Sequence, residues 1–227
     1  MKQEIELVVF DMAGTTVDEE NIVYKTVQKV INDEGYNVSL KEVLNYGAGK
    51  EKHQAILDVL KECTNLEIVE LTAHKVFLNF KAALELAYSN LDIKTFEGTE
   101  ALFKDLRDKN IKVVLNTGYD FVTAKKILIK LGWSIGETID ALVTSDDVEN
   151  GRPAGDMILK AMEITGITDA KKVLKVGDSA IDIEEGKSAQ CGMTAGVLTG
   201  AQTREQIQSA DPTFILNDLT ELRAILF

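Results

Sequence analysis

The stretch Leu7-Val8-Val9-Phe10-Asp11-Met12-Ala13-Gly14-Thr15-Thr16-Val17-Asp18 decides the fold of this chain. Its apolar, β-branched first half predicts a strand buried on both faces of a parallel sheet. Asp11 ends that strand before a small-residue turn, where open α/β sheets hold their ligands. Gly14 permits close approach to an oxyanion, to which the hydroxyls of Thr15 and Thr16 can donate hydrogen bonds. Taken alone, Asp11 is more typical of a residue that ends a strand and caps a turn, so the functional interpretation depends on the rest of the chain.

The composition is that of an ordinary globular protein. The chain has 227 residues, of which 45% are hydrophobic and 27% charged, enough for one large domain or for a domain with an insert. No apolar run is long enough to span a bilayer, and the N-terminus lacks the apolar segment of a signal peptide. We therefore expect a cytoplasmic protein with no membrane partner.

The net charge of −12 argues against broad contact with nucleic acid. An acidic chain can still bind a small phosphate if it supplies local cations. The two cysteines, Cys63 and Cys191, lack metal-type spacing, and idle thiols are expected rather than a disulfide.

Residues 19–90 contain apolar positions at helical spacing and almost nothing typical of a strand. Helices are predicted over 22–31, from a capping box at Ser39 and Glu42, over 50–63 and over 66–88. Beyond residue 93, strands near 111–116, 141–144, 173–176, 194–198 and 213–216 alternate with helices, which predicts a parallel sheet. The fold class is thus α/β, with a Rossmann-like core over 1–17 and 92–227 and an inserted all-helical domain over 18–91.

Polar residues follow four of the predicted strands. After Asp11 come the segments Asn116-Thr117-Gly118-Tyr119, Asn150-Gly151-Arg152-Pro153-Ala154 and Gly177-Asp178-Ser179-Ala180-Ile181-Asp182. Thr117 and Gly118 can hold phosphate oxygens, and Arg152 is the cation that an acidic protein needs. Asp11, Asp178 and a backbone carbonyl would form an all-oxygen site suited to Mg²⁺. Each residue alone has an ordinary structural explanation, but their joint order predicts a phosphate site.

The ordered set of Asp11, Thr117, Arg152 and Asp178 with Asp182 resembles the haloacid dehalogenase superfamily. The resemblance implies an Asp11 nucleophile, an aspartyl-phosphate intermediate and a Mg²⁺ cofactor. It further implies a cap domain formed by the helical insert. The implied residues are, for phosphate, Ala13, Gly14, Thr15, Thr117, Gly118 and Arg152, and, for the metal, Asp11, Ala13, Asp178 and Asp182.

Within that superfamily the chain resembles the phosphonoacetaldehyde hydrolases more than the phosphatases. Ala13 stands where phosphatases have a second Asp, and Arg152 stands where they usually have Lys. The segment Gly47-Ala48-Gly49-Lys50-Glu51-Lys52-His53 resembles the one that carries a Schiff-base lysine and a nearby histidine. The resemblance implies that Lys50 forms the imine and that His53 and Tyr119 assist proton transfer. Tyr46 and the Gly-Ala-Gly run depart from that segment.

Two reactions therefore remain open. An imine would let the carbon of a phosphonate leave as a neutral enamine, so that no acid is needed at position 13. The alternative is hydrolysis of a small phosphate ester without imine chemistry. A third class, a non-catalytic phosphate-binding protein, is disfavoured because nucleophile, acids and cation are all present. The apolar face of residues 22–31 further predicts a homodimer through the cap.

Overall fold

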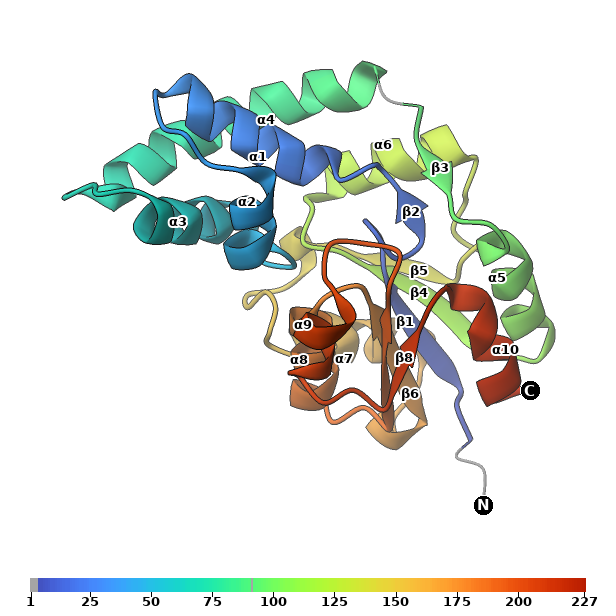
Figure 1. Cartoon of the computed structure of the whole chain (residues 1–227). Helices are drawn as coiled ribbons and strands as arrows, with labels where there is room; N and C mark the ends of the chain where they lie inside the picture. The colour runs from blue at the N-terminus through green and yellow to red at the C-terminus, as the bar shows by residue number, and fades with distance from the viewer. Residues whose placement is uncertain (1–3, 91) are drawn as a thin grey trace.

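The structure, a computed structural model, describes residues 4–90 and 92–227. A six-stranded sheet has the order β5-β4-β1-β6-β7-β8, and every pairing in it is parallel. The strands are β1 (Leu7–Asp11), β4 (Lys112–Asn116), β5 (Ala141–Val143), β6 (Val173–Gly177), β7 (Met193–Val197) and β8 (Phe214–Leu216). The predicted parallel α/β core is thus confirmed, with β1 near its centre (Figure 1).

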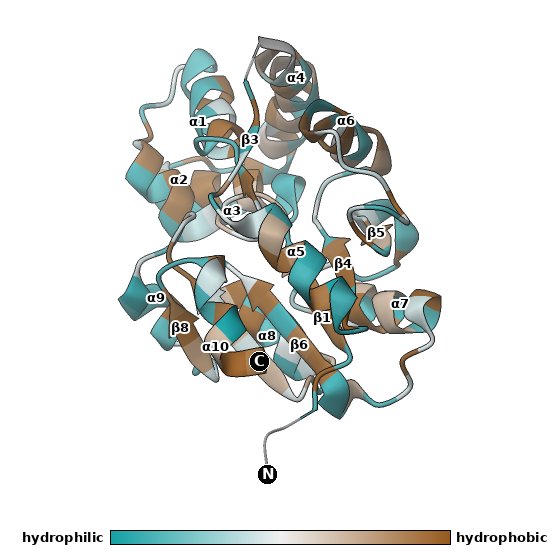
Figure 2. Ribbon diagram, turned by 90° about the vertical axis from the view of Figure 1, so that its right-hand side faces the viewer, coloured by the Kyte–Doolittle hydropathy of each residue, from teal (hydrophilic) through white to brown (hydrophobic). Residues whose placement is uncertain are grey.

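Helices cover both faces of the sheet. They are α5 (Thr99–Asp108), α6 (Phe121–Leu131), α7 (Asp156–Thr165), α8 (Ala180–Ser188), α9 (Arg204–Gln208) and α10 (Leu222–Leu226), with 3₁₀ turns η1 (Ser145–Asp147), η2 (Ala170–Lys172) and η3 (Leu219–Glu221). Alternate residues of β1 face opposite cores, since Val8 and Phe10 pack with α5 and α6 while Leu7 and Val9 pack with α7. The strands are accordingly apolar on both faces (Figure 2).

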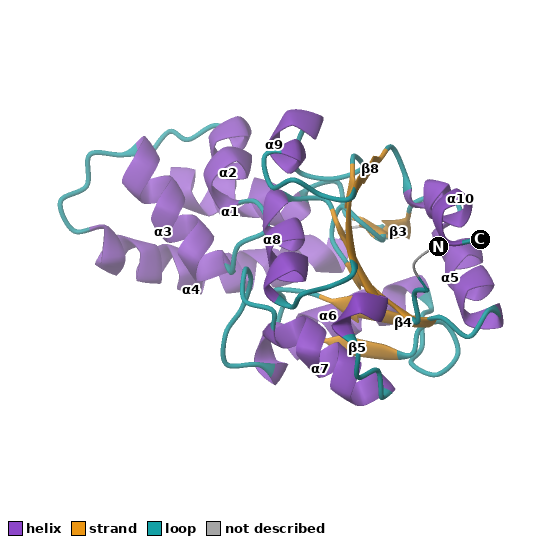
Figure 3. Cartoon of the chain, turned by 90° about the horizontal axis from the view of Figure 1, so that it is seen from below, coloured by secondary structure: helices purple, strands orange, loops and turns teal. Residues whose placement is uncertain are grey.

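Between β1 and β4 the chain forms a helical insertion. Its helices are α1 (Ile22–Asp33), α2 (Leu40–Gly47), α3 (Lys52–Cys63) and α4 (Val69–Asn90). Figure 3 shows this insertion at one side of the sheet, with α5 and α10 toward the opposite side. Two short strands that the sequence did not indicate, β2 (Val17–Asp18) and β3 (Lys94–Thr95), pair antiparallel where the chain enters and leaves the insertion. The predicted boundary at residue 91 lies outside the described residues.

Several predicted elements differ from the structure. Helix α3 begins at Lys52 rather than at residue 50, and the short helix α9 was not predicted. The apolar face of α1 is not exposed, because Val23, Val27, Val30 and Ile31 are buried in the core. That face therefore cannot be the one that pairs with a second copy.

Two further findings concern the whole of the described chain. The thiols of Cys63 and Cys191 are unbonded, as expected. None of the described helices combines the length and the apolar character that a bilayer span requires.

Candidate active site

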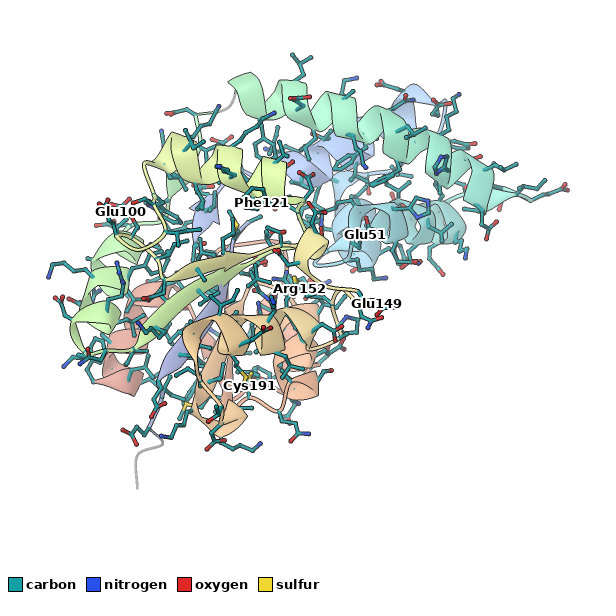
Figure 4. All side chains as sticks on the ribbon, turned by 180° about the vertical axis from the view of Figure 1, so that it is seen from behind. Glu51, Glu100, Phe121, Glu149, Arg152 and Cys191 are labelled. Carbon is teal, nitrogen blue, oxygen red and sulfur yellow. The ribbon has the colours of Figure 1, made fainter. Side chains whose placement is uncertain are left out.

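Asp11 lies at the carboxyl end of the central strand β1 and is buried. On one side it is in register with Asn116, the last residue of β4, and on the other side β6 ends one residue before Asp178. Because these strands are parallel, the loops that follow them meet at the same edge of the sheet. Arg152 reaches this edge from the loop between η1 and α7 (Figure 4).

The guanidinium of Arg152 is the centre of the polar cluster, with only 5% of its side chain exposed. Its Nη1 donates to Asp11 Oδ1 at 2.7 Å and lies 3.2 Å from Asp182 Oδ1. Its Nε donates to Glu185 Oε2 at 3.0 Å, and its Nη2 donates to both oxygens of Asn116 at 3.0 and 3.1 Å. Such a fork of donors fixes the position of the Asp11 carboxylate.

A second buried cation, Lys175, was missed by sequence reasoning. Its Nζ donates to Asn116 Oδ1 at 2.6 Å and lies 3.1 Å from both Asp182 Oδ1 and Glu185 Oε2. Asn116 also donates to Glu185 at 2.8 Å, so the four side chains form one network. A lysine inside the apolar strand Val173–Gly177 was the available signal, because a buried ammonium requires charged partners.

The carboxylate of Asp178 has no such cation. It accepts a hydrogen bond from the backbone amide of Ala201 at 2.5 Å, and in the described part of the chain no Lys, Arg or His pairs with it. Burial, followed by the charges of Asp11 and Asp182, raises its pKa well above the usual value. Two backbone segments pack against the Asp178 carboxylate, since a Cβ built at Gly14 or at Gly200 would overlap its Oδ2 atom.

Asp182 does not share this uncompensated environment. Although burial acts to raise its pKa, the charges of Arg152 and Lys175 lower it, and Ser179 Oγ donates to Oδ2 at 2.6 Å. No three His, Cys, Asp or Glu side chains among the described residues are arranged to hold a metal together. The structure places the Asp182 carboxylate against Arg152 and Lys175, and Asp182 does not line the cavity beside Asp11, so its role as a metal ligand stays a prediction.

A cavity of about 20 Å³ adjoins Asp11. Its lining includes seven of the predicted site residues: Asp11, Ala13, Thr117, Gly118, Tyr119, Arg152 and Asp178. Gly14 and Thr15 lie in the turn that follows β1. Gly14 has a φ of 79°, and the buried Thr15 Oγ1 lacks a hydrogen-bond partner among the described residues. This volume holds about one water molecule, so a phosphoryl group requires the cavity to widen.

Lys50 and His53 are not brought to this cavity. The Nζ of Lys50 donates to Asp58 Oδ2 at 2.5 Å, and one third of the side chain is exposed. The ring of His53 packs edge-on against Phe77 of α4, with 5.4 Å between centroids. Neither of these two predicted site residues lines the cavity beside Asp11 in this structure.

Lys52 lines the cavity instead, from the first position of α3. The chain bends before this helix because Gly49, at a φ of 77°, packs so closely on Ser179 and Ile181 that a Cβ would overlap both. Glu51 then caps α3 by accepting from Gln54 N, so the helix starts two residues after Lys50. Figure 4 marks Glu51 at this helix start.

The half-buried Lys52 side chain has an environment suited to chemistry. Its Nζ donates to the carbonyl of Lys50 at 2.7 Å and lies 5.5 Å from the centre of the Tyr24 ring. Burial, and then the charge of Arg152, lower the pKa of Lys52 from its usual value. A lysine with a lowered pKa supplies more of the neutral amine that attacks carbonyl carbon.

Tyr119 belongs to a buried polar chain that the sequence did not reveal. Its hydroxyl lies 2.8 Å from the hydroxyl of Tyr88, which donates to Glu19 Oε2 at 2.8 Å. Burial raises the pKa of Glu19 to about 7. Lys52, Gly118 and Tyr119 also line a second cavity of about 490 Å³ between α4 and α6.

Comparisons with known proteins identify the family of this chain. The model of the haloacid dehalogenase-like hydrolase family matches residues 5–190. Phosphonoacetaldehyde hydrolase of Bacillus cereus (strain B4264) is 30% identical over 225 residues, covering 92% of this chain and 83% of the relative.

Solved structures share the fold at lower identity. A phosphonoacetaldehyde hydrolase like protein from Oleispira antarctica has a TM-score of 0.82 and 21% identity, covering 99% of this chain and 92% of its own. A hydrolase from Pseudomonas syringae has a TM-score of 0.82 and 22% identity, covering 98% of this chain and 100% of its own. The resemblance found in the motifs is thereby confirmed, and the chain is an enzyme that belongs to the haloacid dehalogenase-like hydrolases.

Proposed function

We propose that the chain is a Mg²⁺-dependent hydrolase in which a carboxylate oxygen of Asp11 attacks the phosphorus of a small phosphonate or phosphate. The observation that carries this proposal is the convergence of Asp11, Thr117, Arg152 and Asp178 on one cavity. Arg152 orients the attacking carboxylate, and Thr117 and Gly118 offer contacts to phosphoryl oxygens. Water then hydrolyses the aspartyl phosphate.

The charges of the cluster suit a divalent cation. Three carboxylates, from Asp11, Asp182 and Glu185, pair with two cations, Arg152 and Lys175. The neighbouring carboxyl of Asp178 pairs with no cation among the described residues, and a bound divalent cation would stabilise its ionised form. The pair of Asp11 and Asp178, with the backbone carbonyl of Ala13, would hold Mg²⁺ through oxygen atoms. When bound, Mg²⁺ would stabilise the negative charge that develops on the phosphoryl group.

Substituting Gly200 tests the metal site. We expect Gly200→Ala to weaken Mg²⁺ binding by about 10-fold to 100-fold, because its Cβ would displace the buried carboxylate of Asp178. The measurement is the rise in unfolding midpoint during a Mg²⁺ titration. Gly151→Ala is the matched control, since nothing lies within 4 Å of a Cβ there. Equal Mg²⁺ responses in both variants would remove Asp178 from the metal site.

For the substrate, we propose a phosphonate with an aldehyde, such as phosphonoacetaldehyde, with Lys52 in place of Lys50 as the imine-forming residue. Ala13 cannot protonate a leaving group, whereas an imine draws the electron pair of the breaking carbon–phosphorus bond into a neutral enamine. The named relative and the lowered pKa of Lys52 support this reaction. Condensation joins the Lys52 amine to the aldehyde carbon and releases one water molecule.

Borohydride trapping distinguishes the two lysines. With phosphonoacetaldehyde and borohydride, we expect a covalent adduct on the peptide that carries Lys52 and loss of phosphate release in Lys52→Met. Lys50→Met is the matched control and should be trapped as efficiently as the wild type, because Lys50 pairs with Asp58 away from the cavity. An adduct on Lys50 alone would reverse the assignment.

Phosphate ester hydrolysis is the second candidate, and the size of the adjoining cavity favours it. About 490 Å³ is far more than a two-carbon aldehyde fills, and is typical of pockets for larger organic ligands. A panel of phosphate esters run beside phosphonoacetaldehyde decides between them. Ester turnover that persists in Lys52→Met would favour the phosphatase.

A further inference from the structure

The absence of an acid at position 13 leaves a phosphate ester without an evident proton donor for its leaving oxygen. Protonation of an alkoxide by a positioned acid is typically worth about 10²-fold to 10⁴-fold in rate. A replacement donor must be buried, protonated near neutral pH and connected to the cavity beside Asp11. Glu19, which lies between β2 and α1, meets all three conditions.

We propose that Glu19 supplies the proton for the leaving group through the hydroxyls of Tyr88 and Tyr119. This inference rests on the proposed attack by Asp11 and deepens it for phosphate esters. Both links of the chain are 2.8 Å long, and Tyr119 lines the cavity shared with the nucleophile. Because a hydroxyl carries one proton, Tyr88 donates to Glu19 and accepts from Tyr119 while Glu19 is ionised. Protonation of Glu19 reverses that direction and points a proton toward the cavity.

The Asp11 oxygen bonds to phosphorus while the bond from phosphorus to the ester oxygen breaks. That oxygen takes the proton of Tyr119, which is replaced from Tyr88 and in turn from the Glu19 carboxyl, so that Glu19 ends as a carboxylate. When water attacks the aspartyl phosphate, the same chain carries its proton back to Glu19.

The surroundings of Glu19 support a proton held near neutral pH. Only 3% of the residue is exposed, and burial is the largest cause of its pKa of about 7. The Tyr88 hydrogen bond, the charge of Lys52 and the Val23 amide lower that pKa, whereas the charge of Asp11 raises it. The titratable groups that act on Glu19 from the elements around it are Asp11, Tyr24, Lys52, Tyr88 and Tyr119.

The test compares kcat between pH 5.5 and about 9 for an alkyl phosphate and for p-nitrophenyl phosphate, whose leaving group departs without a proton. In the wild type we expect kcat for the alkyl ester to fall above pH about 7, as Glu19 loses its proton. Glu19→Gln should lower that kcat by about 10²-fold or more and remove the basic limb. Tyr88→Phe should act likewise, and p-nitrophenyl phosphate turnover should change little in both.

Glu20→Gln is the matched control, since this neighbouring carboxylate is exposed, and it should keep the wild-type profile. The fold of Glu19→Gln is checked by urea unfolding. A group whose folded pKa is raised destabilises the folded chain as pH rises through it, so the variant should lose no stability at pH 8.

Three results would overturn the inference. One is an unchanged basic limb in Glu19→Gln, and another is an equal loss of kcat on both substrates, which indicates a merely structural role. The third is failure of the wild type to hydrolyse either ester while it still releases phosphate from phosphonoacetaldehyde, which would remove the ester reaction on which the inference rests. All three results leave the attack of Asp11 on a phosphonate standing.

Discussion

Replacing Asp11 with Asn is expected to lower kcat by about 10⁴-fold or more, because an amide cannot replace the carboxylate as a nucleophile. The measurement is phosphate release with Mg²⁺ at saturating substrate. The variant should still fold, since Asp182 and Glu185 remain to pair with Arg152. The loss should appear for phosphonate and ester substrates alike, because both reactions require this carboxylate to attack phosphorus.

The intermediate gives a second readout for the same substitution. Acid quenching of the wild type during turnover should leave a phosphoryl group on the peptide that contains Asp11, and the variant should show none. Asp58→Asn is the matched control, because Asp58 lies on the helical insertion and pairs with Lys50. Normal turnover by Asp11→Asn, or a phosphoryl group on another residue, would refute the assigned nucleophile.

The fold could be predicted because its signals are local and periodic. The apolar run that ends at Asp11 is a pattern of neighbouring residues. The helical spacing of residues 22–90 repeats over every one or two helical turns, so both patterns can be recognised in short segments of the sequence. Helix α9 was not predicted because its five residues are too few to show a helical periodicity. Strands β2 and β3 were not predicted because a pair of two-residue strands forms only where segments distant in the sequence meet. The parallel arrangement of the sheet strands was then predicted from the alternation of strands and helices along the chain.

The site was predictable where a residue directly follows a strand. Asp11, Thr117 and Asp178 are held by the sheet, so their meeting at one edge follows from topology. Lys50 was misplaced because the choice between two lysines depends on a bend fixed by contacts of Gly49 with α8 and the residue before it. A local sequence pattern cannot predict this contact, because Gly49 and α8 are far apart in the chain.

Glu19 and Tyr88 illustrate the same limit. They are 69 residues apart, and their hydrogen bond forms only because α4 returns to the point where the insertion begins. Their roles were invisible in the sequence, whereas Lys175 was visible as a charge inside an apolar strand. A buried charge can therefore be recognised in the sequence when it interrupts an apolar strand. The residues that pair with it can be identified only from the structure.

Replacing Arg152 with Met should lower the free energy of unfolding by about 3–5 kcal/mol at pH 7, since removing one partner leaves buried charges uncompensated. Among the described residues, Asp182 and Glu185 would then keep Lys175 as their ion-pair partner, and Asp11 would lose its own. The measurement is urea unfolding. Arg223→Met is the matched control: Arg223 forms a partly exposed pair with Asp105, and its loss should cost about 1 kcal/mol or less.

The pH dependence of the stability lost in Arg152→Met distinguishes two causes, namely uncompensated buried charge and lost side-chain packing. In the wild type the charge of Arg152 helps to hold the pKa of Asp182 below its usual value, so that stabilisation persists until the pH falls through the lowered value. Without Arg152 the folded-state pKa of Asp182 rises, and the variant regains stability as this carboxyl takes up a proton. The difference between wild type and Arg152→Met should therefore be largest near pH 7 and shrink toward pH about 4. A difference that stays constant over this range would mean that Arg152 stabilises the site by packing rather than by charge.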